Sequence, residues 1–218
     1  MEDAALQSYL ESIISPERLK RFDEVLAHRT NYITVVMEDL YHMHNSSAVI
    51  RSCEVFGVQN VHVVENEFAK QLDKKIALGA EKWVDLHTHE TTMNCLKKLR
   101  ADGYTIIGTT PHKEADTSGE FEITGKTALL FGTEKEGLSE LALSEADGFI
   151  KIPMVGFTES LNVSVAAAII LQDLTHKLRK SSLNWELTEE EKQVKKLEWT
   201  KKSIKNIDKI VARFQSGN

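Results

Sequence analysis

The sequence is poor in several features that define whole classes of protein. It has 2 cysteines and 3 prolines in 218 residues. Its longest apolar stretch, 163–171, is about half the roughly 18 residues that a membrane-spanning helix needs. Cys53 and Cys95 alone supply neither a disulfide framework nor a four-ligand zinc site. The acidic start, 1–12, lacks the basic segment of a secretory signal. We therefore expect a reduced, soluble, cytoplasmic protein.

The composition that remains is that of an ordinary globular protein with unevenly distributed charge. Apolar residues make up 41% and charged residues 28%, which excludes a wholly disordered chain. The net charge is −6, yet residues 192–213 carry eight lysines and arginines against Glu198 and Asp208. This segment is therefore +6 and the rest of the chain −12. Such a basic segment is typical of an appendage that contacts phosphates, although a solvated helix face has the same composition.

Hydrophobic periodicity predicts alternating strands and helices between residues 31 and 178. The expected strands are 32–37, 60–64, 82–86, 104–108, 127–131 and 149–152. The expected helices are 46–56 with Asn45 as its cap, 68–78, 90–101, a short one after Ser139, and 162–178. This order predicts an α/β fold whose mostly parallel sheet is covered by helices on both faces.

Helical segments flank this core. Residues 16–29 carry an apolar stripe, and beyond a polar break at 180–190 apolar residues recur at helical spacing as far as Phe214. The second pattern predicts one amphipathic helix that docks on another surface with its lysines outward. We accordingly divide the chain into an N-terminal helical extension (1–30), a central domain (31–180) and a basic C-terminal helical extension (181–218).

The first of three unusual loops follows the first expected strand. It leads through Asn45 into a helix that contains Arg51. An arginine there either pairs with Glu54 or Glu38, or holds its guanidinium near the strand ends, where it can grip a phosphate in bidentate fashion.

Two further loops follow strands of the expected sheet. In 131–139 two glycines lie five residues apart, without the spacing of a P-loop or a dinucleotide fingerprint. In 152–167 a Pro–Gly loop leads to Ser160 and Asn162 at a helix start. These polar residues are good capping groups, and the same groups with the helix-start N–H donors can hold a polar ligand.

Together and in this order, the three segments resemble the motifs of the SpoU (TrmH-like) family of RNA 2′-O-ribose methyltransferases, in the SPOUT superfamily. They read Asn-x-x-Ala-x-x-Arg-x(5)-Gly from Asn45, Phe-Gly-x-Glu-x-x-Gly-Leu-Ser from Phe131, and Ile-Pro-Met-x-Gly-x-x-x-Ser-Leu-Asn-Val-Ser-Val-Ala from Ile152. The resemblance covers 31–178. Residues 21–64 and the short extensions resemble the branch of tRNA guanosine-18 2′-O-methyltransferases more closely.

The resemblance implies a fold and a cofactor that periodicity does not indicate. It implies a deep trefoil knot in the C-terminal part of the sheet, a homodimer, and S-adenosylmethionine bound by the knot loops. The cofactor contacts of the family, largely made by backbone, map to Thr109, Gly132, Ile152 and Leu161. The polar catalytic set maps to Asn45, Arg51, Glu134, Ser160 and Asn162.

The implied reaction moves a methyl group to a ribose 2′-oxygen of tRNA, with guanosine-18 of the D loop as the expected target. The cofactor carries the methyl group, so the protein must place the oxygen and help to remove its proton. Arg51, the catalytic arginine of the family, acts either as a base or as a stabiliser of negative charge. The second role costs less, because an arginine side chain holds its proton strongly.

The expected RNA contacts are basic residues at both ends of the chain, which would bind phosphates. They are Arg18, Lys20, Arg21, Arg29, Lys195, Lys196, Lys201, Lys202 and Lys205. Two alternatives remain open: a ribosomal RNA 2′-O-ribose methyltransferase, and a non-catalytic RNA-binding factor on the same fold. The His-x-His pairs at 42–44 and 87–89 lack a third ligand at metal spacing, so no metal is expected. No membrane is expected as a partner either, because no apolar run approaches the length of a membrane span.

Overall fold

The computed structural model describes residues 2–39, 43–64, 79–111 and 115–216. The chain forms two compact units: residues 30–185 make the larger one, and residues 1–29 with 186–218 make the terminal one. Among the described residues, no helix combines the length and the apolar character needed to cross a bilayer.

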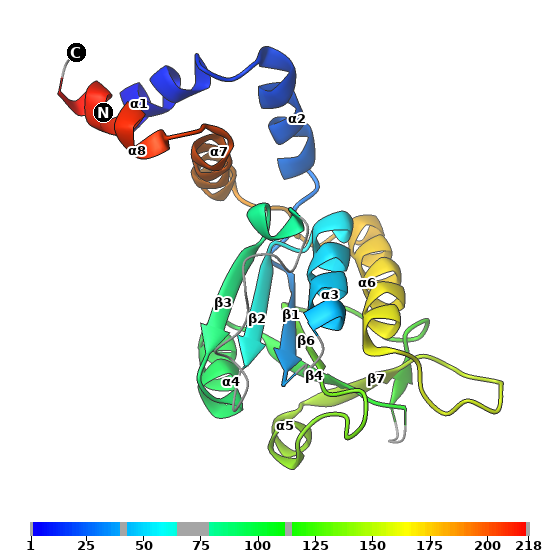
Figure 1. The fold of residues 1–218 in the computed structure, drawn as a ribbon. Coiled ribbons are helices and arrows are strands. Elements are labelled where there is room, and N and C mark those ends of the chain that lie inside the picture. The colour runs from blue at the N-terminus through cyan, green and yellow to red at the C-terminus, as the bar shows by residue number, and fades with distance from the viewer. Residues whose placement is uncertain (1, 40–42, 65–78, 112–114, 217–218) are drawn as a thin grey trace. The chain divides into compact units, whose positions relative to one another are not determined.

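Seven parallel strands form the sheet of the larger unit (Figure 1). They are β1 (Ile33–Glu38), β2 (Asn60–Val64), β3 (Asp85–His89), β4 (Thr105–Thr109), β5 (Asp116–Thr117), β6 (Thr127–Phe131) and β7 (Gly148–Lys151). Their order across the sheet is β3-β2-β1-β6-β4-β7-β5, and every pairing is parallel. The neighbours β1 and β6 are buried along their whole length, as strands covered on both faces must be.

Helices cover both faces of this sheet. On one face α3 (Met43–Phe56) and α6 (Val163–Lys180) lie side by side (Figure 1) and share a buried cluster with Val35 of β1. On the other face α4 (Thr92–Ala101) and α5 (Glu140–Glu145) share a second cluster with Val36. Since successive strand residues point to opposite faces, β1 serves both clusters. The predicted α/β fold with a parallel sheet is confirmed.

Several predicted boundaries are wrong. The strand expected at 82–86 begins only at Asp85, because Ala80–Lys82 forms a 3-10 helix, η2. Helix α3 begins at Met43, so Asn45 lies in its first turn instead of capping it. Strand β5 was not expected, because two residues are too few for a periodic pattern. The helix expected at 68–78 lies outside the described residues.

Four helices from both ends of the chain form the terminal unit: α1 (Glu2–Glu11), α2 (Pro16–Leu26), α7 (Glu189–Ser203) and α8 (Ile207–Gln215). Trp199 is buried against Phe22, with ring centroids 5.8 Å apart in an edge-to-face arrangement. The prediction of a single C-terminal helix is wrong. Asn206 adopts a left-handed backbone conformation, with φ of 56°, which separates α7 from α8.

Candidate functional site

A cavity of about 360 Å³ lies where β4, β6 and β7 end. Its walls come from the segments that follow these strands and from the first turns of α6. The carboxyl ends of parallel strands are where α/β sheets bind ligands, and this volume is typical of a small-molecule site. All four residues expected to bind cofactor line it: Thr109, Gly132, Ile152 and Leu161.

The loop after β6 is closed by its own backbone. Thr133 and Gly137 exchange two backbone hydrogen bonds, of 2.9 and 3.0 Å. Gly137 has a φ of 73°, which favours glycine, and a side chain on Gly132 would come within 2.2 Å of the Gly137 carbonyl. The two glycines therefore allow the loop to fold tightly, with Glu134 exposed on it and lining the cavity.

Glu38, named above only as a partner for Arg51, anchors the end of this loop. Its buried carboxylate accepts hydrogen bonds from the Ser139 backbone N–H at 2.9 Å, the Ser139 hydroxyl at 2.7 Å and the Thr92 hydroxyl at 2.5 Å. The Ser139 hydroxyl in turn caps α5. The sequence does carry a signal for this role, because Glu38 is an acidic residue at the end of an apolar strand. A carboxylate buried there needs hydrogen-bond partners.

Asn162 connects the three motifs. Its Oδ1 caps α6 by accepting from the backbone N–H groups of Ser164 and Val165, at 2.9 and 3.4 Å. Its Nδ2 donates to Glu134 Oε1 at 2.5 Å and to Asn45 Oδ1 at 3.1 Å. The fold thus brings together three of the five residues expected to be catalytic, over sequence separations of 28 and 117 residues.

The other two expected residues lie outside this network. Ser160 is exposed and lines the cavity. Arg51 is exposed on α3 and makes no hydrogen bond or ion pair with another described residue. Of the two alternatives for Arg51, pairing with Glu54 or Glu38 is accordingly not formed in the described part of the chain.

The residues expected to bind RNA all lie in the terminal unit. Those that are exposed are Arg18, Lys20, Arg21, Lys202 and Lys205. Lys195, Lys196 and Lys201 are partly buried. Two of these are held by ion pairs, Lys195 with Glu198 at 2.9 Å and Lys196 with Asp23 at 2.7 Å.

Arg29 is the exception and needs a correction. Its side chain is only 1% exposed, and its guanidinium lies over the Trp199 ring, 5.4 Å from the centroid. Such a cation–π contact stabilises the interior of the unit. A phosphate at the protein surface cannot reach this group, so we remove Arg29 from the expected RNA contacts.

The arrangement around the cavity is suited to a ligand with both apolar and polar parts. Leu138, Ile152 and Leu161 offer apolar wall, whereas Glu134 and Ser160 bring a carboxylate and a hydroxyl to the same cavity. The missing side chain of Gly132 makes room for the Gly137 backbone, so the closed loop itself forms this wall of the cavity.

Comparison with known proteins identifies the relatives of this chain. Residues 32–172 match the model of the SpoU rRNA Methylase family. A tRNA (guanosine(18)-2′-O)-methyltransferase of Borreliella burgdorferi is 38% identical over 212 residues, which are 96% of this chain and 97% of the relative. The protein of the same name from Thermus thermophilus is 40% identical over 166 residues, 76% of this chain and 86% of the relative.

Solved structures agree with these relatives. The A. aeolicus TrmH/SpoU tRNA modifying enzyme superposes with a TM-score of 0.77 at 33% identity, over 87% of this chain and 98% of that one. The SpoU methyltransferase AviRb of Streptomyces viridochromogenes, solved with AdoMet, superposes with a TM-score of 0.62 at 25% identity, over 72% and 62% of the two chains. From its motifs, its cavity and these matches, this chain belongs to the SpoU rRNA Methylase family.

Proposed function

We propose that this chain transfers a methyl group from S-adenosylmethionine to a ribose 2′-oxygen of tRNA, with guanosine-18 of the D loop as the target. One observation carries the proposal: Asn162 joins Asn45 and Glu134, one residue from each motif, beside a cavity at the strand ends. The substrate follows from relatives that are named for this reaction and match most of the chain.

The residues of the cavity fit the cofactor. Ile152 and Leu161 would hold the adenine ring between apolar side chains, and the backbone around Gly132 would recognise its polar edge. The carboxylate of Glu134 faces the same cavity and would attract the positive charge of the molecule. When bound, S-adenosylmethionine supplies an electrophilic methyl group.

The chain's own residues would position the ribose and control charge. We assign Arg51 to stabilising the negative charge that develops on the 2′-oxygen or to clamping the adjacent phosphate, because a guanidinium offers five N–H donors and no acceptor. Asn45, held by Asn162 through its Oδ1, would orient the ribose. Ser160 would donate or accept a hydrogen bond at the edge of the cavity.

The proposal extends to assembly and chain threading. Val155 and Phe157 are fully exposed in the loop after β7, and Val165 and Ile169 are partly exposed on the helix that follows. Apolar surface of this kind is typical of an interface, and we assign it to a homodimer. The trefoil knot implied by the motifs belongs to the same proposal, supported by the gathering of the motif loops around one cavity.

The two units would divide the work. We assign methyl transfer to the central domain and phosphate contacts to the two extensions, whose exposed basic residues support that role. The chain divides into one unit of residues 30–185 and another of residues 1–29 with 186–218. This division supports a central domain that is flanked by an N-terminal and a C-terminal extension. We expect the reaction in the cytoplasm, where tRNA is used.

The test is methyl transfer from labelled S-adenosylmethionine to an unmodified tRNA transcript. A transcript with adenosine in place of guanosine-18 and the Arg51→Ala enzyme serve as controls. We expect label in the first transcript and its loss in both controls. Label in a ribosomal RNA fragment alone would move the target to ribosomal RNA, and cofactor binding without transfer to any RNA would favour a non-catalytic factor.

A further inference from the structure

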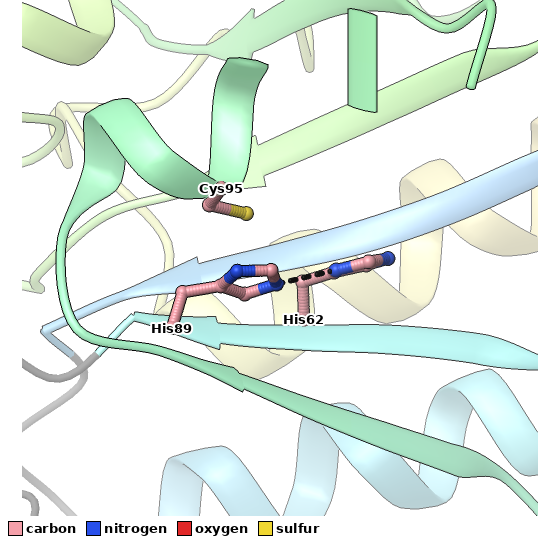
Figure 2. A group of neighbouring side chains, drawn as sticks. All are labelled: His62, His89 and Cys95. Atoms are coloured by element: carbon pink, nitrogen blue, oxygen red, sulfur yellow. Dashed lines mark hydrogen bonds between the residues drawn. The ribbon is translucent and has the colours of Figure 1, made fainter. Parts of the chain in front are cut away.

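Two histidines and a cysteine from three elements meet on the sheet face covered by α4. They are His62 on β2, His89 on β3 and Cys95 on α4 (Figure 2). One ligand atom of each lies within 4.8 Å of the other two. None of the three lines the cavity at the strand ends, so the cluster is separate from the proposed methyl-transfer site.

The cluster is held by rigid surroundings. His62 Nδ1 and His89 Nε2 are 2.8 Å apart, the distance of a hydrogen bond. His87 stacks on His62 with ring centroids 4.7 Å apart, and its Nε2 lies 2.9 Å from Asn60 Oδ1. The rings of His87 and His89 both stack on His62 and so limit its orientation, and metal-ligating histidines are commonly held in one ring orientation.

The donor atoms suit a borderline-soft transition metal. Zinc binds imidazole nitrogen at about 2.0–2.1 Å and cysteine sulfur at about 2.3 Å, in tetrahedral geometry. Ligand atoms of such a tetrahedron are therefore separated by about 3.3–3.6 Å. The observed separations run from 2.8 Å to at most 4.8 Å, on either side of these values, so side-chain shifts of about 1 Å would admit the ion.

Burial and charge also fit a bound cation. His62 and Cys95 are buried, whereas His89 is partly exposed, which leaves one open side for entry and for a water ligand. Glu38 acts electrostatically on the Cys95 sulfur and would offset the charge of a dication. The positive charge of Lys98 acts on both histidines and would oppose a bound cation. The Lys98 ammonium group is, however, paired with Asp102 at 3.1 Å.

We infer that His62, His89 and Cys95 bind one zinc(II)-type ion, with a water molecule as the fourth ligand on the exposed side of His89. The ion would tie β2, β3 and α4 together and so stabilise this corner of the sheet. It replaces the expectation of no metal, which rested on the absence of a third ligand at metal spacing. Of the pair at 87–89 only His89 is a ligand, and the fold adds His62 and Cys95. These two lie 33 residues apart in the sequence, so no local spacing indicates that they meet.

The test uses the full chain, freed of metal with a chelator and titrated with zinc chloride in a calorimeter. We expect one ion per chain and a rise in the melting temperature on binding. Cys95→Ala and His89→Gln should each weaken zinc binding at least about tenfold and abolish the rise, because each removes a ligand. Cys53→Ala and His176→Gln, which change a buried thiol and an exposed imidazole elsewhere, should bind as the unaltered chain does.

Cobalt(II) provides a second readout that needs no variant. The unaltered chain should develop the intense visible bands of tetrahedral cobalt together with a sulfur-to-cobalt charge-transfer band. If Cys95→Ala does not fold, this spectrum and the titration of His89→Gln decide the question. The absence of zinc binding by the unaltered chain, equal binding by His89→Gln, or a cobalt spectrum without the charge-transfer band would overturn the inference.

Discussion

The side-chain amide of Asn162 donates from Nδ2 to Glu134 Oε1 at 2.5 Å, and so connects the start of α6 to the loop after β6. The same amide caps α6 through its oxygen. One side chain therefore holds a helix end and a loop that lines the cavity. The two roles use different atoms, which makes them separable by substitution.

Asn162→Asp and Asn162→Ala should separate these roles. Aspartate keeps the oxygen that caps α6, whereas alanine loses it and should cost about 1 kcal/mol of unfolding free energy. Aspartate also removes the Nδ2 donor of Asn162 and places a second carboxylate beside Glu134. We expect methyl transfer to fall more than about tenfold in both variants, which corresponds to about 1.4 kcal/mol. Chemical denaturation and labelled-methyl assays measure the two effects.

A second substitution provides the control for this prediction. Glu134→Gln, added to Asn162→Asp, restores a donor–acceptor pair with the direction of the bond reversed. The double variant should therefore recover part of the activity lost by Asn162→Asp, a coupling that a double-mutant cycle measures. Independent, additive losses would show that the hydrogen bond does not matter for the reaction.

Gly132→Ala should abolish cofactor binding without unfolding the sheet. The added Cβ would lie 2.2 Å from the Gly137 carbonyl, so the loop around Glu134 must move. Gly125→Ala is the matched control, because nothing lies within 4 Å of its Cβ. Calorimetric titration with S-adenosylmethionine compares the two variants, and unchanged affinity in Gly132→Ala would count against a cofactor site at this loop.

Glu38→Gln should loosen the same loop from its other end. The carboxylate accepts three hydrogen bonds, and an amide in its place turns one acceptor into a donor that faces other donors. We expect the free energy of unfolding to fall by about 1–3 kcal/mol, together with weaker cofactor binding. The exposed Glu90→Gln should change neither quantity. Equal stability of the two variants would contradict the anchoring role.

Basic residues of the terminal unit should differ by burial. Lys205→Ala, at an exposed position, should weaken tRNA binding modestly and reduce its salt dependence by about one unit of slope. Arg29→Ala should lower the melting temperature instead, because its guanidinium is buried over Trp199. Filter binding at several salt concentrations and thermal melting distinguish the two. A salt slope unchanged by Lys205→Ala would remove it from the RNA surface.

The sheet was predictable wherever apolar runs are continuous. Residues 127–131 match β6 residue for residue, because a strand buried on both faces leaves an apolar run in the sequence. Residues 60–64 also match β2, through valines at 61, 63 and 64, although His62 interrupts them. Two of the motif loops follow β6 and β7, at the strand ends where α/β sheets bind ligands, and ligand binding by them stays a prediction. Short or half-exposed elements such as β5 and β3 leave no comparable pattern.

Contacts between distant residues were not predictable. The bond between Asn45 and Asn162 spans 117 residues, and the meeting of His62 with Cys95 depends on the strand order. The break between α7 and α8 rests on the backbone conformation of Asn206, inside an apolar pattern that continues across it. Burial of Arg29 was missed because a charged side chain at the end of a helix reads as exposed.

The measurement that tests the account most directly is nucleoside mass spectrometry of a tRNA transcript after reaction with the enzyme and S-adenosylmethionine. We expect 2′-O-methylguanosine at position 18, formed at a rate strongly reduced in Arg51→Ala and in Asn162→Ala. A methyl group on a base, or an Arg51→Ala enzyme as fast as the unaltered one, would contradict the proposed site.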